Sequence, residues 1–243
     1  MEPEACKKLI VEVSEFFQKG NALDILVNNA GMQYVASLED LPDEKWAQVL
    51  QLNLSSCFYT TKQGNIISCY YLLTYSLILS LSIQVLPIMR ANGFGRIINI
   101  ASTHGIVASC NKAAYVASKH GLIGLTKVTA LETATEPITC NAVCPGFVYT
   151  KLVENQIVKK ANEEGKTTHL RDQVLIYLLT YLLTHTPGIS VADAKINLVS
   201  EKHPSKEYVD MEDLSELVYF LTQDCAKQIR GSAYVIDGGW TAI

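Results

Sequence analysis

The chain has 243 residues, a length that suits one α/β domain or two small ones. Hydrophobic residues make up 49% of the sequence, enough for a sizeable core, and the formal net charge of −4 argues against a nucleic-acid-binding surface. The seven cysteines are scattered and form no CxxC pair or cluster with histidine, so we expect no metal site and no disulfide framework. Residues 1–8 are charged and lack an apolar run, which argues against a signal peptide and, with the cysteine pattern, favours a cytoplasmic protein.

The hydrophobic pattern predicts helices that alternate with short apolar strands. In chain order, the predicted elements are helix 4–19, strand 23–27, a helix from Pro42 through Asn53, strand 96–101, helix 112–133, strand 139–143, helix 212–223 and strand 233–237. Alternation of this kind implies an α/β fold with a parallel sheet covered by helices on both faces.

Two uncharged stretches, at 64–84 and within 168–193, interrupt the alternation, and both contain the string Tyr-Leu-Leu-Thr-Tyr. Each is long enough to be a transmembrane candidate, but a span at 66–83 would put Asn53 and Ser102 on opposite sides of a membrane. Their polar content and shared string favour translated intron sequence instead, a hypothesis that sequencing the transcript tests. Gly64 and Gln84 are compatible with codons that contain the splice-site bases.

Tyr115 and Lys119 lie four residues apart in the predicted helix 112–133 and therefore share one of its faces. A phenol has a pKa of roughly 10, and a nearby positive charge favours the phenolate, which can take a proton from an alcohol. The pair alone is weak evidence, because a surface tyrosine and lysine at this spacing are common. Ser102 strengthens it, since it directly follows strand 96–101, and ligands of parallel sheets bind beyond the carboxyl ends of strands.

Two other predicted strands also end in small or polar residues. Asn28-Asn29-Ala30-Gly31 follows one of them, where small side chains let the backbone approach a flat ligand. Pro145-Gly146 ends the other, and Thr150 lies beyond it. Three strand ends at one edge of a sheet indicate a binding site.

Together these residues resemble the short-chain dehydrogenase/reductase family: NNAG at 28–31, a helical Asn53, a strand-end Ser102, YxxxK at 115–119 and PGxxxT at 145–150. The resemblance implies a Rossmann-type doubly wound parallel sheet. It also implies that Tyr115 is the acid/base, that Lys119 tunes it and contacts a ribose, that Ser102 orients the substrate oxygen and that Asn53 holds a relay water. The implied cofactor contacts are Asn28, Ala30, Gly31, Tyr115, Lys119, Pro145, Gly146, Val148 and Thr150.

Within that family, the chain is most similar to the bacterial-type D-3-hydroxybutyrate dehydrogenases. That group binds a small carboxylate through four polar residues, which correspond here to Gln33, His104, Lys112 and Gln156. Aromatic side chains close its pocket, and this chain has Trp240 and Phe147 there, the latter where tryptophan is usual. The resemblance implies NAD-dependent oxidation of (R)-3-hydroxybutyrate in ketone-body metabolism, a substrate lid at about 150–210 and a homotetramer, although the stretch at 64–84 extends one of the assembly helices.

The chain departs from the family in having no TGxxxGxG turn, the element that holds the cofactor pyrophosphate. Residues 4–19 resemble the family's third helix, so we expect a single domain over 1–243 that lacks the first strands and the Gly-rich phosphate loop. The residue that selects NAD over NADP is missing with them, so NADP stays open. Three other hypotheses about the protein remain: a non-catalytic truncated product, a reductase of another small hydroxy acid or of 3-oxoacyl groups, and a membrane-attached protein.

Overall fold

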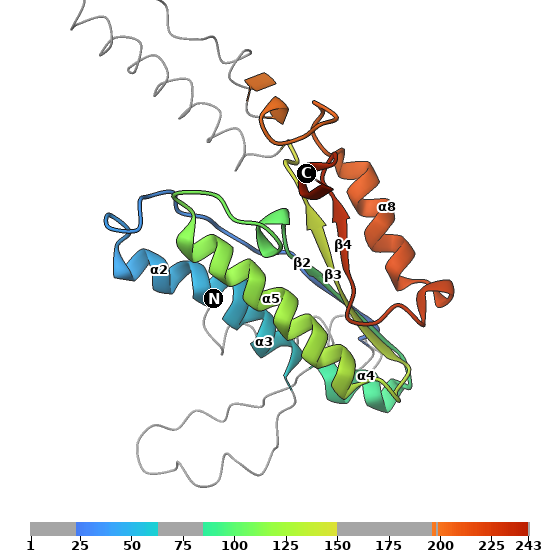
Figure 1. The fold of residues 1–243 in the computed structure, drawn as a ribbon. Coiled ribbons are helices and arrows are strands. Elements are labelled where there is room, and N and C mark those ends of the chain that lie inside the picture. Colours follow the sequence, from blue (N-terminus) through green and yellow to red (C-terminus); the bar gives the residue numbers. More distant parts are fainter. Residues whose placement is uncertain (1–22, 63–84, 150–195, 198, 243) are drawn as a thin grey trace, which may run out of the picture. The chain divides into compact units, whose positions relative to one another are not determined.

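A computed structural model of the chain describes residues 23–62, 85–149, 196–197 and 199–242 (Figure 1). These residues belong to two compact units: the first draws on Met1–Pro145 and Ser215–Val235, and the second on Gly146–Leu214 and Ile236–Ile243. The predicted helix 4–19, both uncharged stretches, Thr150 and Gln156 lie outside the described residues.

The first unit is built on a sheet whose strands follow the order β1-β2-β3-β4. The four strands are β1 (Ile25–Asn28), β2 (Gly95–Ile100), β3 (Ile138–Pro145) and β4 (Ala233–Ile236). β1 pairs with β2, and β2 with β3, in parallel, with Ile25 opposite Arg96 and Gly95 opposite Ile138. All four predicted strands are therefore confirmed, and the expected Rossmann-like arrangement with them.

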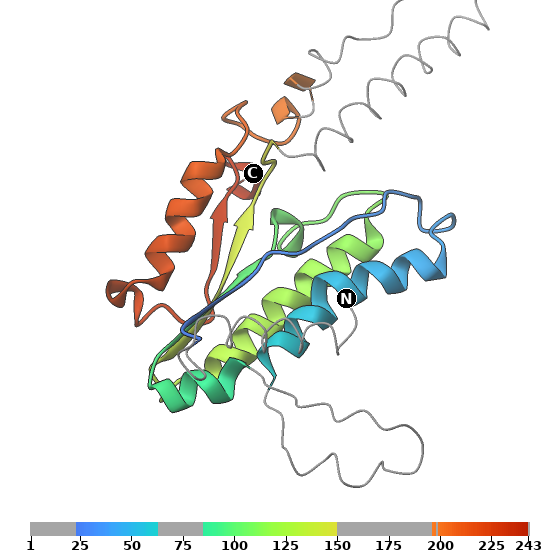
Figure 2. The same ribbon diagram turned by 180° about the vertical axis from the view of Figure 1, so that it is seen from behind.

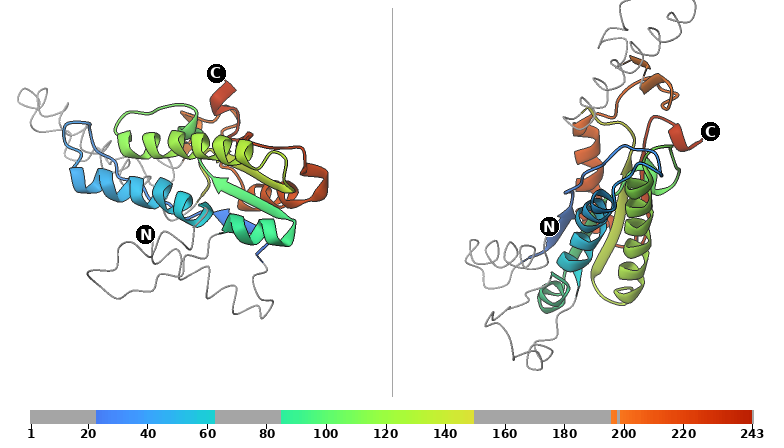
Figure 3. Two further views of the ribbon diagram at one scale, coloured as in Figure 1. Left: turned by 90° about the horizontal axis from the view of Figure 1, so that it is seen from below. Right: turned by 90° about the vertical axis from the view of Figure 1, so that its left-hand side faces the viewer.

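The helices are α2 (Asp43–Leu50), α3 (Ser56–Thr61), α4 (Val85–Asn92), α5 (Ala113–Glu132) and α8 (Met211–Thr222). α2, α3 and α5 lie side by side on one face of the sheet (Figures 1 and 2), and the Ser215–Thr222 part of α8 lies on the other face (Figure 3). Among the described residues, no helix combines the length and apolarity needed to cross a membrane.

The helix predicted from Pro42 through Asn53 begins as expected, with Asp43 and Glu44 in its first turn, where negative charge suits the helix dipole. Its continuation differs from the prediction, because Gln51–Ser55 form a π-helical turn between α2 and α3. Such turns insert one residue into a helix and are frequent at functional sites. The hydrophobic period does not show them.

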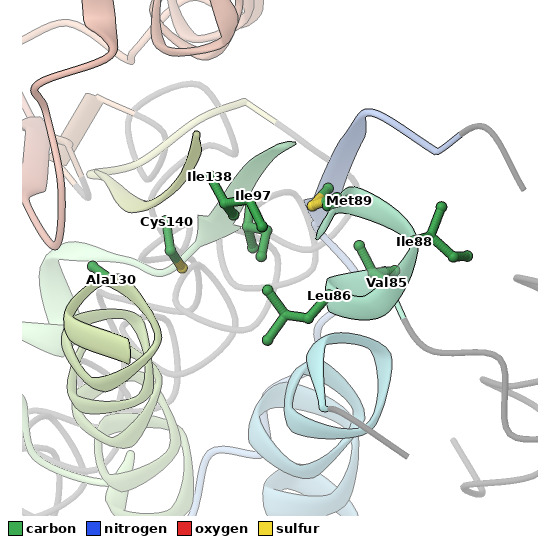
Figure 4. Packing of buried hydrophobic residues seen from close by; sticks show 8 residues of the cluster. All are labelled: Val85, Leu86, Ile88, Met89, Ile97, Ala130, Ile138 and Cys140. Atoms are coloured by element: carbon green, nitrogen blue, oxygen red, sulfur yellow. The ribbon is translucent and has the colours of Figure 1, made fainter. Parts of the chain in front are cut away.

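An apolar cluster joins α4 to the sheet (Figure 4). Its members are Val85, Leu86, Ile88, Met89, Ile97, Ala130, Ile138 and Cys140. The chain passes close to Met89 at the start of β2, where a Cβ on Gly95 would lie 2.5 Å from the Met89 sulfur, so only glycine fits without a shift. α4 thus belongs to the core although it begins directly after the first uncharged stretch.

A line of polar side chains, buried except for the half-buried Asn28, crosses the same face of the sheet. Thr60 of α3 donates to Asn28 of β1 (2.9 Å), Asn28 donates to Asn99 of β2 (2.8 Å), and Asn99 donates to Thr126 of α5 (2.9 Å). Because buried amides cost free energy unless they are hydrogen-bonded, this chain of bonds specifies how α3 and α5 are placed against β1 and β2.

Candidate active site

The predicted site residues of the first unit follow neighbouring strands. Asn28 ends β1, Ser102 comes two residues after β2, and Pro145 ends β3. Because these three strands are adjacent and the pairs are parallel, their carboxyl ends lie along one edge of the sheet. This is the edge at which ligands bind in open α/β sheets.

Ser102, Tyr115 and Lys119 are brought together at this edge. Tyr115 lies in the first turn of α5, half-buried, and its side chain hydrogen-bonds Ser102. The Lys119 Nζ lies 5.7 Å from the centre of the Tyr115 ring and donates a 2.7 Å hydrogen bond to the Ile100 carbonyl at the end of β2. A hydroxyl, a phenol and an amine therefore share one small region.

Burial governs the proton affinities of this group. Burial raises the pKa of Tyr115, and the bond to Ser102 only partly opposes that. Burial also lowers the pKa of Lys119 to about 8, against the effect of the nearby Cys57 and Cys144 thiols. The net shift of the Tyr115 pKa in the protein without ligands is therefore upward, because the loss of solvent is the largest effect on it.

The side chain of Asn53, which is fully buried in the π-helical turn, braces the loop after β1. Its Oδ1 accepts from the Met32 N–H (2.9 Å), while its Nδ2 donates to the Met32 carbonyl (2.8 Å) and to the Ser118 hydroxyl (3.1 Å). Both amide hydrogens are thus used within the protein. Ser118, which also donates to the Tyr115 carbonyl (2.7 Å), was not singled out by the sequence, since nothing marks a serine inside YxxxK.

The space around Gly31 indicates whether a ligand could lie against the loop after β1. Residues 29–31 are exposed, and a Cβ added to Gly31 would lie 3.5 Å from Asn53 Oδ1 and 3.7 Å from Lys119 Nζ. A larger side chain here would fill the space beside the amine, whereas glycine leaves it open. Small, exposed residues beside the Lys119 amine, which is a hydrogen-bond donor, are chemically suited to a flat ligand that carries hydroxyl groups, such as a nucleotide ribose.

Three of the residues predicted to hold a carboxylate, Gln33, His104 and Lys112, are among the described residues. His104 is buried in the short 3-10 helix Thr103–Gly105, its N–H donates to Ser102 Oγ (3.1 Å), and its ring meets the Tyr115 ring edge-on at 5.8 Å. Its Nε2 bonds Ser109 Oγ at 3.0 Å. Gln33 and Lys112 are half-buried, and a bond from the Ala36 N–H to the Asn111 carbonyl (3.0 Å) ties their two loops together.

The remaining predicted contacts belong to the second unit. Phe147 stacks on Trp240 with ring centres 5.3 Å apart, and Val148 forms a bridge with Val209. Gly146 donates to the Ile236 carbonyl at 2.9 Å. The structure therefore pairs the two predicted aromatic residues.

Close packing at Gly105 joins the Ser102–His104 turn to α5. A Cβ there would lie 2.7 Å from Ile123 Cδ1 and 2.9 Å from the Lys119 carbonyl, which is backbone and cannot rotate away. We expect Gly105→Ala to lower the free energy of unfolding by about 1–3 kcal/mol, as measured by urea denaturation. Gly124→Ala is the control, because Gly124 is an exposed α5 residue with nothing within 4 Å, and alanine there should stabilise by up to about 1 kcal/mol. Equal effects of the two changes would contradict the close contact.

The lowered pKa of Lys119 predicts how stability depends on pH. Between about 8 and the ordinary value of 10.5, the unfolded chain binds this proton and the folded protein does not. The contribution of Lys119 to the free energy of unfolding therefore rises with pH over that window, with a limiting slope of about 1.4 kcal/mol per pH unit. We expect the difference between the wild type and Lys119→Met, measured by denaturation at several pH values, to rise from pH 8 to 10. A difference that is flat over this window would show that Lys119 keeps its ordinary pKa.

Comparison with known proteins identifies the family to which the chain and its fold belong. A family profile described as short chain dehydrogenase matches residues 1–65 and 74–161. The D-beta-hydroxybutyrate dehydrogenase of Cupriavidus necator is 43% identical over 219 residues, which cover 90% of this chain and 68% of that enzyme. The enzyme of the same name from Rhizobium meliloti is 41% identical over 220 residues, again covering 90% and 68%.

Solved structures of other dehydrogenases and reductases resemble this fold. 4-Hydroxyisoleucine dehydrogenase complexed with NADH is 26% identical, with a TM-score of 0.66 over 100% of this chain and 78% of that one. A variant of actinorhodin polyketide ketoreductase with NADPH is 28% identical, with a TM-score of 0.72 over 100% and 75%. With its sheet, its Ser102–Tyr115–Lys119 group and these relatives, the chain belongs to the short-chain dehydrogenase family of oxidoreductases.

Proposed function

We propose that the protein is an NAD-dependent dehydrogenase that interconverts (R)-3-hydroxybutyrate and acetoacetate. The observation that carries the proposal is the grouping of Ser102, Tyr115 and Lys119 at the carboxyl edge of the sheet, in a chain 43% identical to a D-beta-hydroxybutyrate dehydrogenase. NAD is proposed from the resemblance to the hydroxybutyrate enzymes, and a nicotinamide nucleotide in general is supported by the similar structures, of which one contains NADH and another NADPH.

The proposed roles follow from donors and acceptors. Ser102 and Tyr115 hydrogen-bond each other and can both bond one substrate oxygen. In oxidation, the hydroxyl proton of the substrate passes to the Tyr115 phenolate, and the hydrogen on the carbinol carbon leaves as hydride with the electron pair of its bond, so that the carbon becomes a carbonyl. A bound NAD would supply the hydride acceptor. In reduction, the Tyr115 phenol returns its proton to the carbonyl oxygen.

The environment of Tyr115 determines its protonation state, and with it which of the two proton transfers is favoured at a given pH. Because burial raises its pKa, the phenol holds its proton at neutral pH and is ready to donate to a ketone. Lys119 stands within 5.7 Å of the ring centre, where its ammonium stabilises the phenolate once the proton has left. We therefore expect oxidation to be favoured as the pH rises.

The substrate class is proposed from His104, Lys112, Gln33 and Gln156. One cation and three neutral donors suit a single small carboxylate. His104 supports this best, because it is held between Ser102, Ser109 and the Tyr115 ring, next to the proposed acid/base. Reduction of 3-oxoacyl groups is the alternative, since a putative ketoacyl reductase of Streptomyces coelicolor is 39% identical over 142 residues. The shorter match, 58% of this chain against 90%, favours the hydroxybutyrate enzymes.

Tyr115→Phe tests the assignment of the base. It removes one oxygen and should lower kcat/KM for (R)-3-hydroxybutyrate by roughly 10²–10⁴-fold, measured as NADH formation, with the denaturation midpoint close to that of the wild type. Tyr219→Phe, on an exposed residue of α8, is the matched control and should change nothing. Activity that survives Tyr115→Phe would refute the role of Tyr115, and a wild-type chain that neither binds NAD nor forms NADH would refute the proposed function.

Lys112→Met tests the carboxylate. The change should raise KM for 3-hydroxybutyrate by about 10–100-fold, as expected for one charge-assisted hydrogen bond, with little change in kcat. Methyl (R)-3-hydroxybutyrate lacks the charge, and its KM should be the same for both proteins. A KM for the ester that rises as much as that for the acid would show that Lys112 acts on folding or on the loop instead.

A further inference from the structure

His203 is fully buried in the second unit, and both of its ring nitrogens contact backbone groups. Nε2 accepts a 2.9 Å hydrogen bond from the Phe147 N–H, and Nδ1 lies 2.8 Å from the Glu207 carbonyl oxygen. A backbone N–H can only donate and a carbonyl can only accept. The ring must therefore carry its hydrogen on Nδ1 and present a bare Nε2, which is possible only for a neutral imidazole.

The same ring packs tightly against the segment that follows β3. It stacks on Phe147 with ring centres 5.6 Å apart and lies 6.0 Å from the centre of Trp240. A Cβ on Gly146 would overlap Nε2, and a Cβ on Gly238 would lie 3.0 Å from Nδ1. Gly146, Phe147 and the turn before Trp240 thus all pack against the His203 ring.

A proton on Nε2 would make the His203 ring positively charged, and among the described residues no carboxylate hydrogen-bonds the ring to balance that charge. The buried Asp237 accepts from the Gly239 N–H (2.9 Å) and the Thr241 N–H (2.7 Å), so both of its oxygens are engaged. Lys202 lies over the Trp240 ring, with Nζ 5.7 Å from its centre. Glu207 meets His203 through its carbonyl, and the side chains of Glu201, Lys206 and Glu207 are exposed. Within the described part of the chain, no hydrogen bond joins His203 to a carboxylate.

We propose that His203 is a positioning residue that holds the Gly146–Val148 segment, through the Phe147 N–H, only while its ring is neutral. A proton taken up from solvent by Nε2 would set one N–H against another and break that bond. The consequence for ligands rests on the proposed function and on the contacts that the family resemblance implies, Gly146 and Val148 for the cofactor and Phe147 and Trp240 for the substrate. Acidification would then weaken binding through a residue that touches neither ligand.

The state of the ring can be tested without any ligand. Nitrogen-15 NMR of histidine-labelled protein, with His203 assigned by its loss in His203→Gln, should show the neutral form protonated on Nδ1. This is the less common tautomer in free histidine, so a folding effect alone would not produce it. A ring protonated on Nε2 at neutral pH would overturn the proposal.

The effect on the segment can be tested by fluorescence. The chain has two tryptophans, so Trp46→Phe leaves Trp240 as the only one, beside His203. We expect its emission to change in a one-proton transition when the folded protein is acidified. Adding His203→Gln should abolish the transition, because Gln offers an oxygen to the Phe147 N–H and an N–H to the Glu207 carbonyl without titrating.

His120→Gln is the matched control, since His120 is an exposed histidine of α5 whose Nδ1 also lies near a carbonyl, 3.0 Å from that of Val116. It should leave the transition of Trp240 unchanged. A transition that persists in His203→Gln, or that is absent from the parent protein, would overturn the proposal.

Kinetics then connect the switch to the proposed function. The ratio of KM for 3-hydroxybutyrate between wild type and His203→Gln should rise by up to tenfold per pH unit below the transition, while the ratio of kcat stays constant. A ratio of KM independent of pH would overturn the effect on binding. A protein inactive on this substrate would contradict the proposed function alone, because the NMR and fluorescence measurements need no substrate.

Discussion

One buried contact organises the first unit: the Lys119 Nζ donates to the Ile100 carbonyl at 2.7 Å, where β2 ends. The side chain is 4% exposed, so its amine is held by this bond and by the residues of α5 around it. The bond fixes the position of α5 along β2. Tyr115, one turn earlier, therefore reaches Ser102 just beyond the strand, and Gly31 of the neighbouring strand end lies beside the amine. The lysine thus has a structural task as well as a chemical one.

The surrounding polar groups hold the same arrangement from both sides. Asn53 ties the loop at Met32 to Ser118 on α5, and the line from Thr60 through Asn28 and Asn99 to Thr126 ties β1 and β2 to the helices below. Gly105 lets the turn after Ser102 lie against the α5 backbone. Since these groups are buried or half-buried, a displacement of one would leave hydrogen-bonding groups unsatisfied, which keeps Ser102, Tyr115 and Lys119 in place.

Burial at the site shifts the pKa values of the side chains to which the proposed chemistry is assigned. It lowers the pKa of Lys119 to about 8 and raises that of Tyr115, so both pKa values move toward the neutral form of the group. A neutral phenol is a proton donor for a ketone, and an amine with a pKa of about 8 is still mostly an ammonium at neutral pH. In the second unit, the two backbone groups at the His203 ring fit only a neutral imidazole.

The sequence by itself determined the four strands, the start of α2, the whole of α5 and α8, and the family, because hydrophobic period, Pro42 and the NNAG and YxxxK motifs are local signals. It also placed Asn28, Ser102 and Pro145 at strand ends, where parallel pairing brings them to one edge. Only the tertiary structure decided the π-helical turn at Asn53, the brace through Ser118, the direction of the Tyr115 pKa and the role of His203. Each of these depends on contacts between residues far apart in the chain, such as Asn53 with Ser118 or Phe147 with His203. Burial and hydrogen-bond direction at such contacts have no local pattern, so no motif could show them.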